Sequence, residues 1–168
     1  MAEKNAHCSY CGNAFDQATK FPRTCASCKM VTYVNPLPVA VIVLPVDDGV
    51  LTIRRGIEPR RGELALPGGF IDHGESWREA CARELCEETG IVVDPKTIDP
   101  FDVHSAPSGM LLVFGLAPPT TAASLPTFAP TNETTECLIL REFQPLAFPL
   151  HTRVLEDFFA QKARRERL

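Results

Sequence analysis

Apolar residues gather into short runs along the chain, and turn-forming residues separate these runs. Residues 39–46 are Val-Ala-Val-Ile-Val-Leu-Pro-Val, residues 50–55 are Val-Leu-Thr-Ile-Arg-Arg, and Asp47-Asp48-Gly49 lies between them. Apolar runs of this length on either side of a short turn are typical of strands paired in a hairpin. We therefore predict two strands, at 39–46 and 50–55, that form a hairpin.

Further strands are expected downstream of this hairpin. Residues 64–66 form a short apolar segment that Pro67-Gly68-Gly69 should end, since Pro and Gly interrupt regular structure. Residues 110–117 are almost wholly apolar, and a last strand is expected at 136–143. The segment 118–132 is rich in Pro, Thr and Ala, which predicts a surface loop.

Two segments carry helix signals. Ser76 and Glu79 match a capping box, and Gly90 is the type of residue at which such a helix ends. Near the C-terminus, apolar side chains recur at helical spacing, at Leu150, Val154, Leu155, Phe158 and Phe159. We predict one helix from about residue 76 to 89 and a closing amphipathic helix, which together with the strands indicates an α/β protein.

Length and composition are those of a globular chain. Its 168 residues leave room for one domain and a small appendage, and 45% hydrophobic with 23% charged residues argues against disorder. The net charge of −4 disfavours binding to phosphate backbones. Residues 1–5 hold no apolar signal core, and no apolar run approaches the roughly 20 residues that cross a bilayer. We expect a cytoplasmic protein without membrane association.

Four of the seven cysteines form two close pairs, Cys8-x2-Cys11 and Cys25-x2-Cys28. Four thiolates arranged in this way can surround Zn²⁺ as a tetrahedron, and they leave no open position for chemistry. Residues 1–34 are poor in aliphatic side chains and need such a constraint to fold. We predict a structural zinc ribbon at 1–34 and a main domain at 35–168.

The ribbon offers few features for binding nucleic acid. Its basic groups are Lys4, Lys20, Arg23 and Lys29, with little aromatic interleaving. A scaffold role or a homodimer contact is therefore the favoured interpretation, and nucleic acid is not the expected partner.

Three carboxylates gather on one side of the predicted helix. At about 100° per residue, Glu84 and Glu88 lie about 40° apart, and Glu87 lies about 60° beyond Glu84. Trp77 and Cys81 project beside them, so these acids border the core-facing side, where repulsion is costly unless cations compensate. Hard anionic oxygens suit Mg²⁺ or Mn²⁺. A helix covered with ordinary ion pairs is the alternative that the helix alone leaves open.

The spacing around this helix decides between the two. From residue 69 the chain is Gly69-x5-Glu75-x7-Arg83-Glu84-Leu85-x-Glu87-Glu88-x-Gly90-Ile91, which resembles the Nudix hydrolase family at every fixed position of its 23-residue box. The resemblance implies a loop-helix-loop within an α/β/α sandwich that has a mixed sheet. It also implies that Glu84, Glu87 and Glu88 bind the metal, while Arg83 and Glu75 orient and support them.

Residues outside the helix are expected to complete the site. Gly68 and Gly69 let the backbone pass close to the metal, and in the family a carbonyl there, here that of Gly68, can join the coordination shell. A base or a further ligand often comes from outside the box, and Glu136 lies in a suitable place, with Glu133 as the second choice.

Arginines upstream of the box are candidates for substrate binding. Guanidinium groups bind oxyanions through two hydrogen bonds, so Arg54, Arg55, Arg60 and Arg61 can clamp phosphates. Exposed salt bridges are the alternative for each of them. The reaction implied by the resemblance is hydrolysis of a phosphoanhydride in a nucleoside diphosphate linked to a further group.

A zinc ribbon before this box is similar to the NADH pyrophosphatase group and, more closely, to zinc-ribbon Nudix proteins related to plant FAD pyrophosphatase. The likeness includes residues 33–36, 133–137 and 146–148. The aromatic array that follows the box in the NADH type is absent, and Leu64 replaces a Trp before the Pro-Gly-Gly turn. Phe70, Phe101 and Phe114 can stack on a base or pack in the core.

The expected substrate is a small nucleotide: a dinucleotide such as FAD or NADH, or ADP-ribose. The alternative hypothesis is a non-catalytic nucleotide sensor whose ribbon binds nucleic acid or a protein partner. Loss of a box carboxylate would favour the sensor, and none is lost.

Overall fold

The computed structural model describes residues 4–16 and 20–165. Contacts divide the chain into two compact units, Met1–Pro36 and Leu37–Leu168, and each is described by itself. In the small unit, β1 (Arg23–Thr24) and β2 (Val31–Thr32) pair antiparallel. In the part of the chain that the model describes, no helix is both long and apolar enough to cross a membrane.

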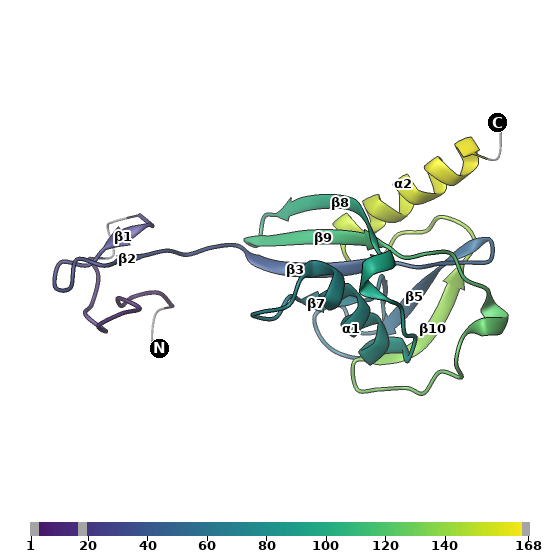
Figure 1. Ribbon diagram of the computed structural model, residues 1–168, viewed down its shortest axis with the longest axis horizontal. Helices are drawn as coiled ribbons and strands as arrows, with labels where there is room; N and C mark the ends of the chain where they lie inside the picture. Colours follow the sequence, from purple (N-terminus) through teal and green to yellow (C-terminus); the bar gives the residue numbers. More distant parts are fainter. Residues whose placement is uncertain (1–3, 17–19, 166–168) are drawn as a thin grey trace. The chain divides into compact units, whose positions relative to one another are not determined.

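The larger unit is built on two sheets (Figure 1). The first is a mixed sheet, in which β3 runs parallel to β9 and every other pair is antiparallel. Its order is β7 (Gly68–Phe70), β3 (Leu37–Val43), β9 (Met110–Leu116) and β8 (Asp99–Ala106). The second sheet is antiparallel and contains β10 (Thr134–Leu140), β5 (Gly49–Arg55), β4 (Pro45–Val46) and β6 (Leu64–Ala65), the last paired with β5.

Helices cover the sheets. The helix α1 (Trp77–Thr89) begins after Ser76, which caps it together with Glu79, and it ends at Gly90 in a left-handed conformation, so both predicted signals are confirmed. The second, α2 (Pro149–Arg165), is the predicted C-terminal helix. Two short 3₁₀ segments, η1 (Pro95–Thr97) and η2 (Ala122–Ser124), lie in connections, the latter within the predicted loop.

The central strand β3 explains why there is a helix on each side. Side chains alternate between the two faces of a strand. Ala40, Ile42 and Leu44 pack in one cluster with Ala80, Cys81 and Leu85 of α1, while Val41 and Val43 pack in another with Phe114 and with Val154 and Leu155 of α2. This arrangement is the mixed α/β fold that the family resemblance implies.

The predicted hairpin is correct only at its tip. Residues 39–46 are not one strand, because the chain passes from the mixed sheet to the antiparallel sheet at Leu44. Only the two residues of β4 pair with β5, while β3 pairs with β7 and β9. Pro45 lacks the N–H that would continue a ladder, which is consistent with a break at this point.

The short strand predicted at 64–66 ends before Pro67 as expected, since β6 is Leu64–Ala65, but the two glycines that follow are not in a loop. Both belong to β7, which pairs with β3. A Cβ at Gly68 would lie 2.4 Å from the carbonyl oxygen of Ala40, so glycine serves a close approach between backbones. The strand β8 was not predicted, since Pro100 and polar residues interrupt its apolar pattern, and the last strand lies at 134–140 rather than 136–143.

Candidate active site and metal centre

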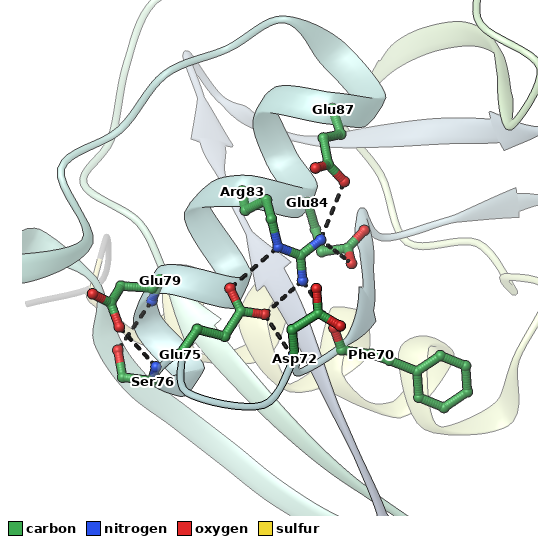
Figure 2. A network of polar contacts seen from close by, with 8 residues as sticks. All are labelled: Phe70, Asp72, Glu75, Ser76, Glu79, Arg83, Glu84 and Glu87. Carbon is green, nitrogen blue, oxygen red and sulfur yellow. Dashed lines mark hydrogen bonds and ion pairs between the residues drawn. The ribbon is translucent and has the colours of Figure 1, made fainter.

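Arg83 is the centre of the polar network at the box (Figure 2). Its Nε and Nη2 donate to the two oxygens of Glu75, at 3.2 and 2.7 Å. Its Nη1 donates to Glu84 at 2.7 Å and to Glu87 at 3.1 Å, and Nη2 also donates to the carbonyl of Phe70 at 2.9 Å. A guanidinium group has five N–H donors. All five of them are therefore used on protein acceptors.

The loop before α1 is held by the same network. Glu75 also accepts a hydrogen bond from the backbone N–H of Asp72, at 2.7 Å. The Arg83 guanidinium lowers the pKa of Glu75, which keeps this carboxylate charged. Glu79 accepts from the N–H of Ser76 at 2.7 Å and so completes the helix cap. These hydrogen bonds hold the loop before α1 against the helix.

The three box carboxylates differ in their surroundings. Glu88 is 5% exposed and accepts from the N–H of Gly68 at 2.9 Å. Burial raises its pKa to about 8. The side chain of Glu84 is 12% exposed, and burial raises its pKa as well, against the effect of Arg83. The side chain of Glu87 is 59% exposed. Glu84 and Glu88 are thus the acids for which charge is costly.

The backbone of β7 leaves no room beside Glu84. A Cβ on Gly69 would lie 2.3 Å from Oε1 of Glu84, closer than any real contact. Glycine at this position therefore allows the carboxylate to lie directly against the strand. Together with the hydrogen bond from Gly68 to Glu88, this brings the carboxylates of Glu84 and Glu88 to the backbone of a single strand.

A cavity of about 980 Å³ opens beside these carboxylates. Its charged lining comprises Arg83, Glu84 and Glu88 from α1, together with Arg55, Glu58, Asp72 and Glu133. Its apolar lining includes Val39, Val41, Leu66, Met110, Leu112, Phe148 and Leu150. The cavity thus combines an acidic region at the box with an apolar wall from the mixed sheet and α2.

Residues predicted outside the box divide into two groups. Glu136 is not in the cavity lining: its carboxylate accepts from Nε of Arg54 at 2.7 Å, across the pairing of β10 with β5. Arg54 also donates to the carbonyl of Gly62 at 3.0 Å. Glu133, the second choice, does line the cavity and raises the pKa of both Glu84 and Glu88 by its charge, although burial is the larger cause.

The remaining arginines also differ. Arg55 lines the cavity, donates to the carbonyl of Pro59 at 2.8 Å and lies 5.0 Å above the ring of Phe148. Arg60 pairs with Glu63 at 3.4 Å. Arg61 is exposed and is not in the lining.

The three phenylalanines predicted as stacking candidates differ in burial and in their contacts. Phe114 is fully buried in the core, and Phe101 packs near Phe158. Phe70 lines the cavity and is 54% exposed, which leaves its ring available to a ligand.

One cavity residue had no sequence signal. His151 lies in α2 on the apolar face that packs against the sheet, and it is 6% exposed. A lone histidine in an apolar helical pattern is indistinguishable from a core residue until the fold is known.

The paired cysteines form a compact cluster in the small unit. The sulfurs of Cys8, Cys11, Cys25 and Cys28 all lie within 4.8 Å of one another, with Cys8–Cys28 at 3.7 Å and Cys11–Cys25 at 3.6 Å. Four sulfurs about 2.3 Å from a central Zn²⁺ lie about 3.8 Å apart. Backbone N–H groups of Cys11 and Tyr10 lower the pKa of Cys8 to about 6, which favours a thiolate. The donor set fits Zn²⁺, as the predicted ribbon requires.

Comparisons with known proteins agree with this geometry. The model of the NUDIX domain matches residues 36–137. An ADP-ribose pyrophosphatase from Methanocaldococcus jannaschii is 39% identical over 75 residues, which are 45% of this chain and 43% of that protein. The NAD-capped RNA hydrolase NudC from Escherichia coli is 31% identical over 88 residues, which are 52% of this chain and 34% of that protein. The chain thus spans less than half the length of either relative.

A solved structure matches nearly the whole chain. The NUDIX hydrolase from Nitrosomonas europaea superposes with a TM-score of 0.77 at 25% identity, covering 94% of this chain and 92% of that one. The family match covers more than half of the residues and includes the box, β7 and β9. The chain belongs to the Nudix family.

Proposed function

We propose that this chain is a Mg²⁺- or Mn²⁺-dependent pyrophosphohydrolase that cleaves the phosphoanhydride of a nucleoside diphosphate linked to another group. One observation carries the proposal: the buried Glu88 and the largely buried side chain of Glu84 lie together at the wall of a large cavity that Glu133 also lines. Burial raises the pKa of both helix carboxylates. A divalent cation would offset the cost of charging them.

The donor set fits such a cation. Carboxylate and carbonyl oxygens are the ligands that Mg²⁺ and Mn²⁺ prefer. Glu84, Glu87 and Glu88, with the carbonyl of Gly68, would hold the ion. When bound, it would stabilise negative charge on the diphosphate and acidify a water molecule. Glu87 is exposed, bonded to Arg83 and outside the cavity lining, so its place among the ligands rests on the box spacing.

Arg83 and Glu75 act as positioning residues in this proposal. Because all five donors of Arg83 are engaged by the protein, none remains for a substrate phosphate. Arg83 instead fixes the carboxylates of Glu84 and Glu87 relative to the loop. Glu75 anchors Arg83 through two hydrogen bonds and keeps it oriented.

The base outside the box is assigned here to Glu133 in preference to Glu136. A general base must reach the proton it removes, directly or through one water. Glu133 lines the cavity, whereas the carboxylate of Glu136 is engaged by Arg54. Arg54 is accordingly a structural partner, and Arg55 is the upstream arginine that can approach a phosphate from the lining.

The cavity suits a substrate of dinucleotide size. Its volume of about 980 Å³ is near the upper end of small-molecule sites, which range from about 300 to 1,000 Å³. Its apolar wall can cover a heterocycle while the acidic region receives the diphosphate. FAD, NADH and ADP-ribose fit this description, and the relatives named for ADP-ribose and NAD-capped RNA support the same chemical class.

The four-cysteine cluster is proposed to hold a structural Zn²⁺ that stabilises the small unit. Its sulfur spacing supports this assignment.

Hydrolysis of a substrate panel tests the proposal. FAD, NADH, NAD and ADP-ribose are incubated with Mg²⁺ or Mn²⁺, and release of AMP is measured for wild type, Glu88→Gln, Glu133→Gln and Glu136→Gln. Glu88→Gln should lower kcat by on the order of 100-fold or more, since it removes a charge that stabilises the transition state. Glu133→Gln should lower kcat more than Glu136→Gln.

Glu142→Gln is the matched control, because Glu142 is exposed and lies outside the cavity. It should retain wild-type kcat. A wild-type protein that cleaves none of the four compounds, with or without metal, would contradict the proposal.

A further inference from the structure

His151 is a buried polar group whose second nitrogen has no protein partner. Its Nδ1 accepts a hydrogen bond from the backbone N–H of Leu66, at 3.3 Å. Among the described residues no hydrogen bond is made by Nε2. The side chain lines the cavity, and Nε2 is not among the buried atoms that lack a partner, so it keeps contact with the cavity.

The bond from Leu66 determines where the ring proton lies. A backbone N–H can only donate, so Nδ1 must be unprotonated to accept from it. In a neutral imidazole the proton is then on Nε2. Burial, with a smaller effect of Arg55, lowers the pKa of His151 to about 3, so the ring is neutral at ordinary pH. His151 therefore presents a fixed, uncharged N–H donor to the cavity.

Aromatic contacts hold this donor in one orientation. The ring of Phe114 meets that of His151 at an angle of 84°, with centroids 5.7 Å apart. The ring of Phe148 lies 5.1 Å away at 59°. Since the hydrogen bond and both ring contacts act on the same side chain, the ring cannot turn without losing one of them. The donor is preorganised, as a recognition group should be.

The donor also lies close to the proposed metal site. The backbone N–H of Leu66 donates to His151. The backbone N–H of Gly68, two residues later, donates to Glu88. Two residues of chain span at most about 7 Å. A ligand whose phosphates lie at Glu88 thus has its adjoining ring within reach of His151, beside the apolar residues of β3 and β9.

We propose that His151 is a specificity residue, whose Nε2–H donates a hydrogen bond to a ring nitrogen or carbonyl oxygen of the nucleotide's heterocycle. This inference rests on the proposed function for the identity of the ligand class. The part of the substrate that lies against the apolar wall is then a planar, neutral ring with a hydrogen-bond acceptor at its edge. A ligand without an acceptor at this place would leave the donor unpaired, which is costly in a buried site.

Two substitutions separate binding from folding. His151→Asn retains an acceptor near the position of Nδ1 for the N–H of Leu66, but it removes the donor at the position of Nε2. His151→Gln places an amide N–H near the position of Nε2, but it weakens the bond to Leu66. A recognition role predicts that ligand affinity is lost in the first variant, while a structural role predicts that stability is lost in the second.

Calorimetric titration with the nucleotide products AMP, FMN and NMN, in the presence of Mg²⁺, gives the readout. We expect His151→Asn to weaken binding of at least one of them by about five- to tenfold, and His151→Gln to restore it to within about twofold. In hydrolysis assays the same loss should raise KM and leave kcat nearly unchanged, because the hydrogen bond is made to the heterocycle and not to the reacting phosphates.

Unchanged affinity in His151→Asn would overturn the inference and make His151 a core residue only, as would failure of all three nucleotides to bind wild type. The outcomes remain separate from those of the proposed function. A wild type that binds a nucleotide through His151 but cleaves nothing would contradict the hydrolase alone. A wild type that cleaves substrate with no effect of His151→Asn would contradict this inference alone.

Discussion

At the scale of single residues, the box glutamates are not equivalent. Glu88 is buried and the side chain of Glu84 is 12% exposed, and burial raises the pKa of both, whereas Glu87 is mainly exposed. A cation that binds here replaces water and protons at buried carboxylates, so metal binding and proton release should be coupled. Glu88, as the more buried of the two, should dominate that coupling.

The pKa of Glu88 predicts how the metal-free protein responds to pH. An unfolded glutamate releases its proton near 4.5, while burial raises the folded pKa to about 8. Between these values the folded state binds more protons, so the free energy of unfolding should fall as pH rises, by up to about 1.4 kcal/mol per pH unit. Urea unfolding in buffer free of Mg²⁺ and Mn²⁺, followed by fluorescence of the single Trp77, measures this slope.

Glu88→Gln is the comparison for that experiment. The amide retains an acceptor for the N–H of Gly68 but cannot ionise, so the slope should become smaller. Glu84, whose pKa is also raised, leaves a remaining slope of the same sign. Equal slopes in wild type and variant would mean that Glu88 is ionised in the folded protein without metal.

The grouping of the site residues was predictable only where they are close in the sequence. The box glutamates and Arg83 share one helix, so their grouping follows from its repeat. The choice between Glu133 and Glu136 depended on which one faces Arg54 across two strands, and that register is set by distant parts of the chain. His151 was not identifiable, because its partner Leu66 is 85 residues away.

At the scale of elements, residues close in the sequence predicted where α1 begins and ends. They did not predict which strands pair with each other. Both ends of α1 were predicted because Ser76 and Gly90 act within one turn of the helix. The apolar run of β3 predicts that the strand is buried, but it does not predict which strands lie beside it. The sheet to which β3 belongs could therefore not be predicted. The edge strand β8 was missed because its apolar pattern is reversed: Asp102 and His104 lie on its half-buried face, while Val103 is exposed.

The cap of α1 can be tested directly. Ser76→Ala removes the oxygen that accepts from the N–H of Glu79, and should lower the free energy of unfolding by about 1 kcal/mol. Denaturation followed by Trp77 fluorescence measures the change. Ser76→Asp retains a capping acceptor and serves as the control; a similar loss in both variants would argue against the cap as the cause.

At the scale of the whole molecule, the two units depend on different sources of stability. The larger unit contains extensive apolar clusters between its sheets and helices. Among its described residues, the smaller unit has two strands of two residues each and the cysteine cluster. With so little secondary structure, this unit is expected to need a metal ion to fold.

Removal of one sulfur should therefore affect one unit and spare the other. Wild type is expected to contain about one zinc ion per chain, and Cys25→Ser less than half of that, because three thiolates hold the ion less tightly. Metal analysis of the purified proteins measures the content. Cys86→Ser, which alters an exposed cysteine outside the cluster, is the control.

The same variant tests whether the units fold independently. Trp77 belongs to the larger unit, so the unfolding midpoint that it reports should be nearly the same in wild type and Cys25→Ser. Equal zinc in both proteins would contradict the four-cysteine site. A large shift of the Trp77 midpoint would contradict independent folding.

The crossing at Leu44 has a mechanical consequence for the larger unit. One uninterrupted segment contributes β3 to the mixed sheet and β4 to the antiparallel sheet, and the carbonyl of Leu44 accepts from Leu51 of the second sheet. The two sheets are thus joined by the main chain at this point. Separating them there would break hydrogen bonds in both sheets. We therefore expect the two sheets to move little relative to each other near Leu44, and ligands of different size to be accommodated by exposed side chains of the cavity lining, such as Phe70.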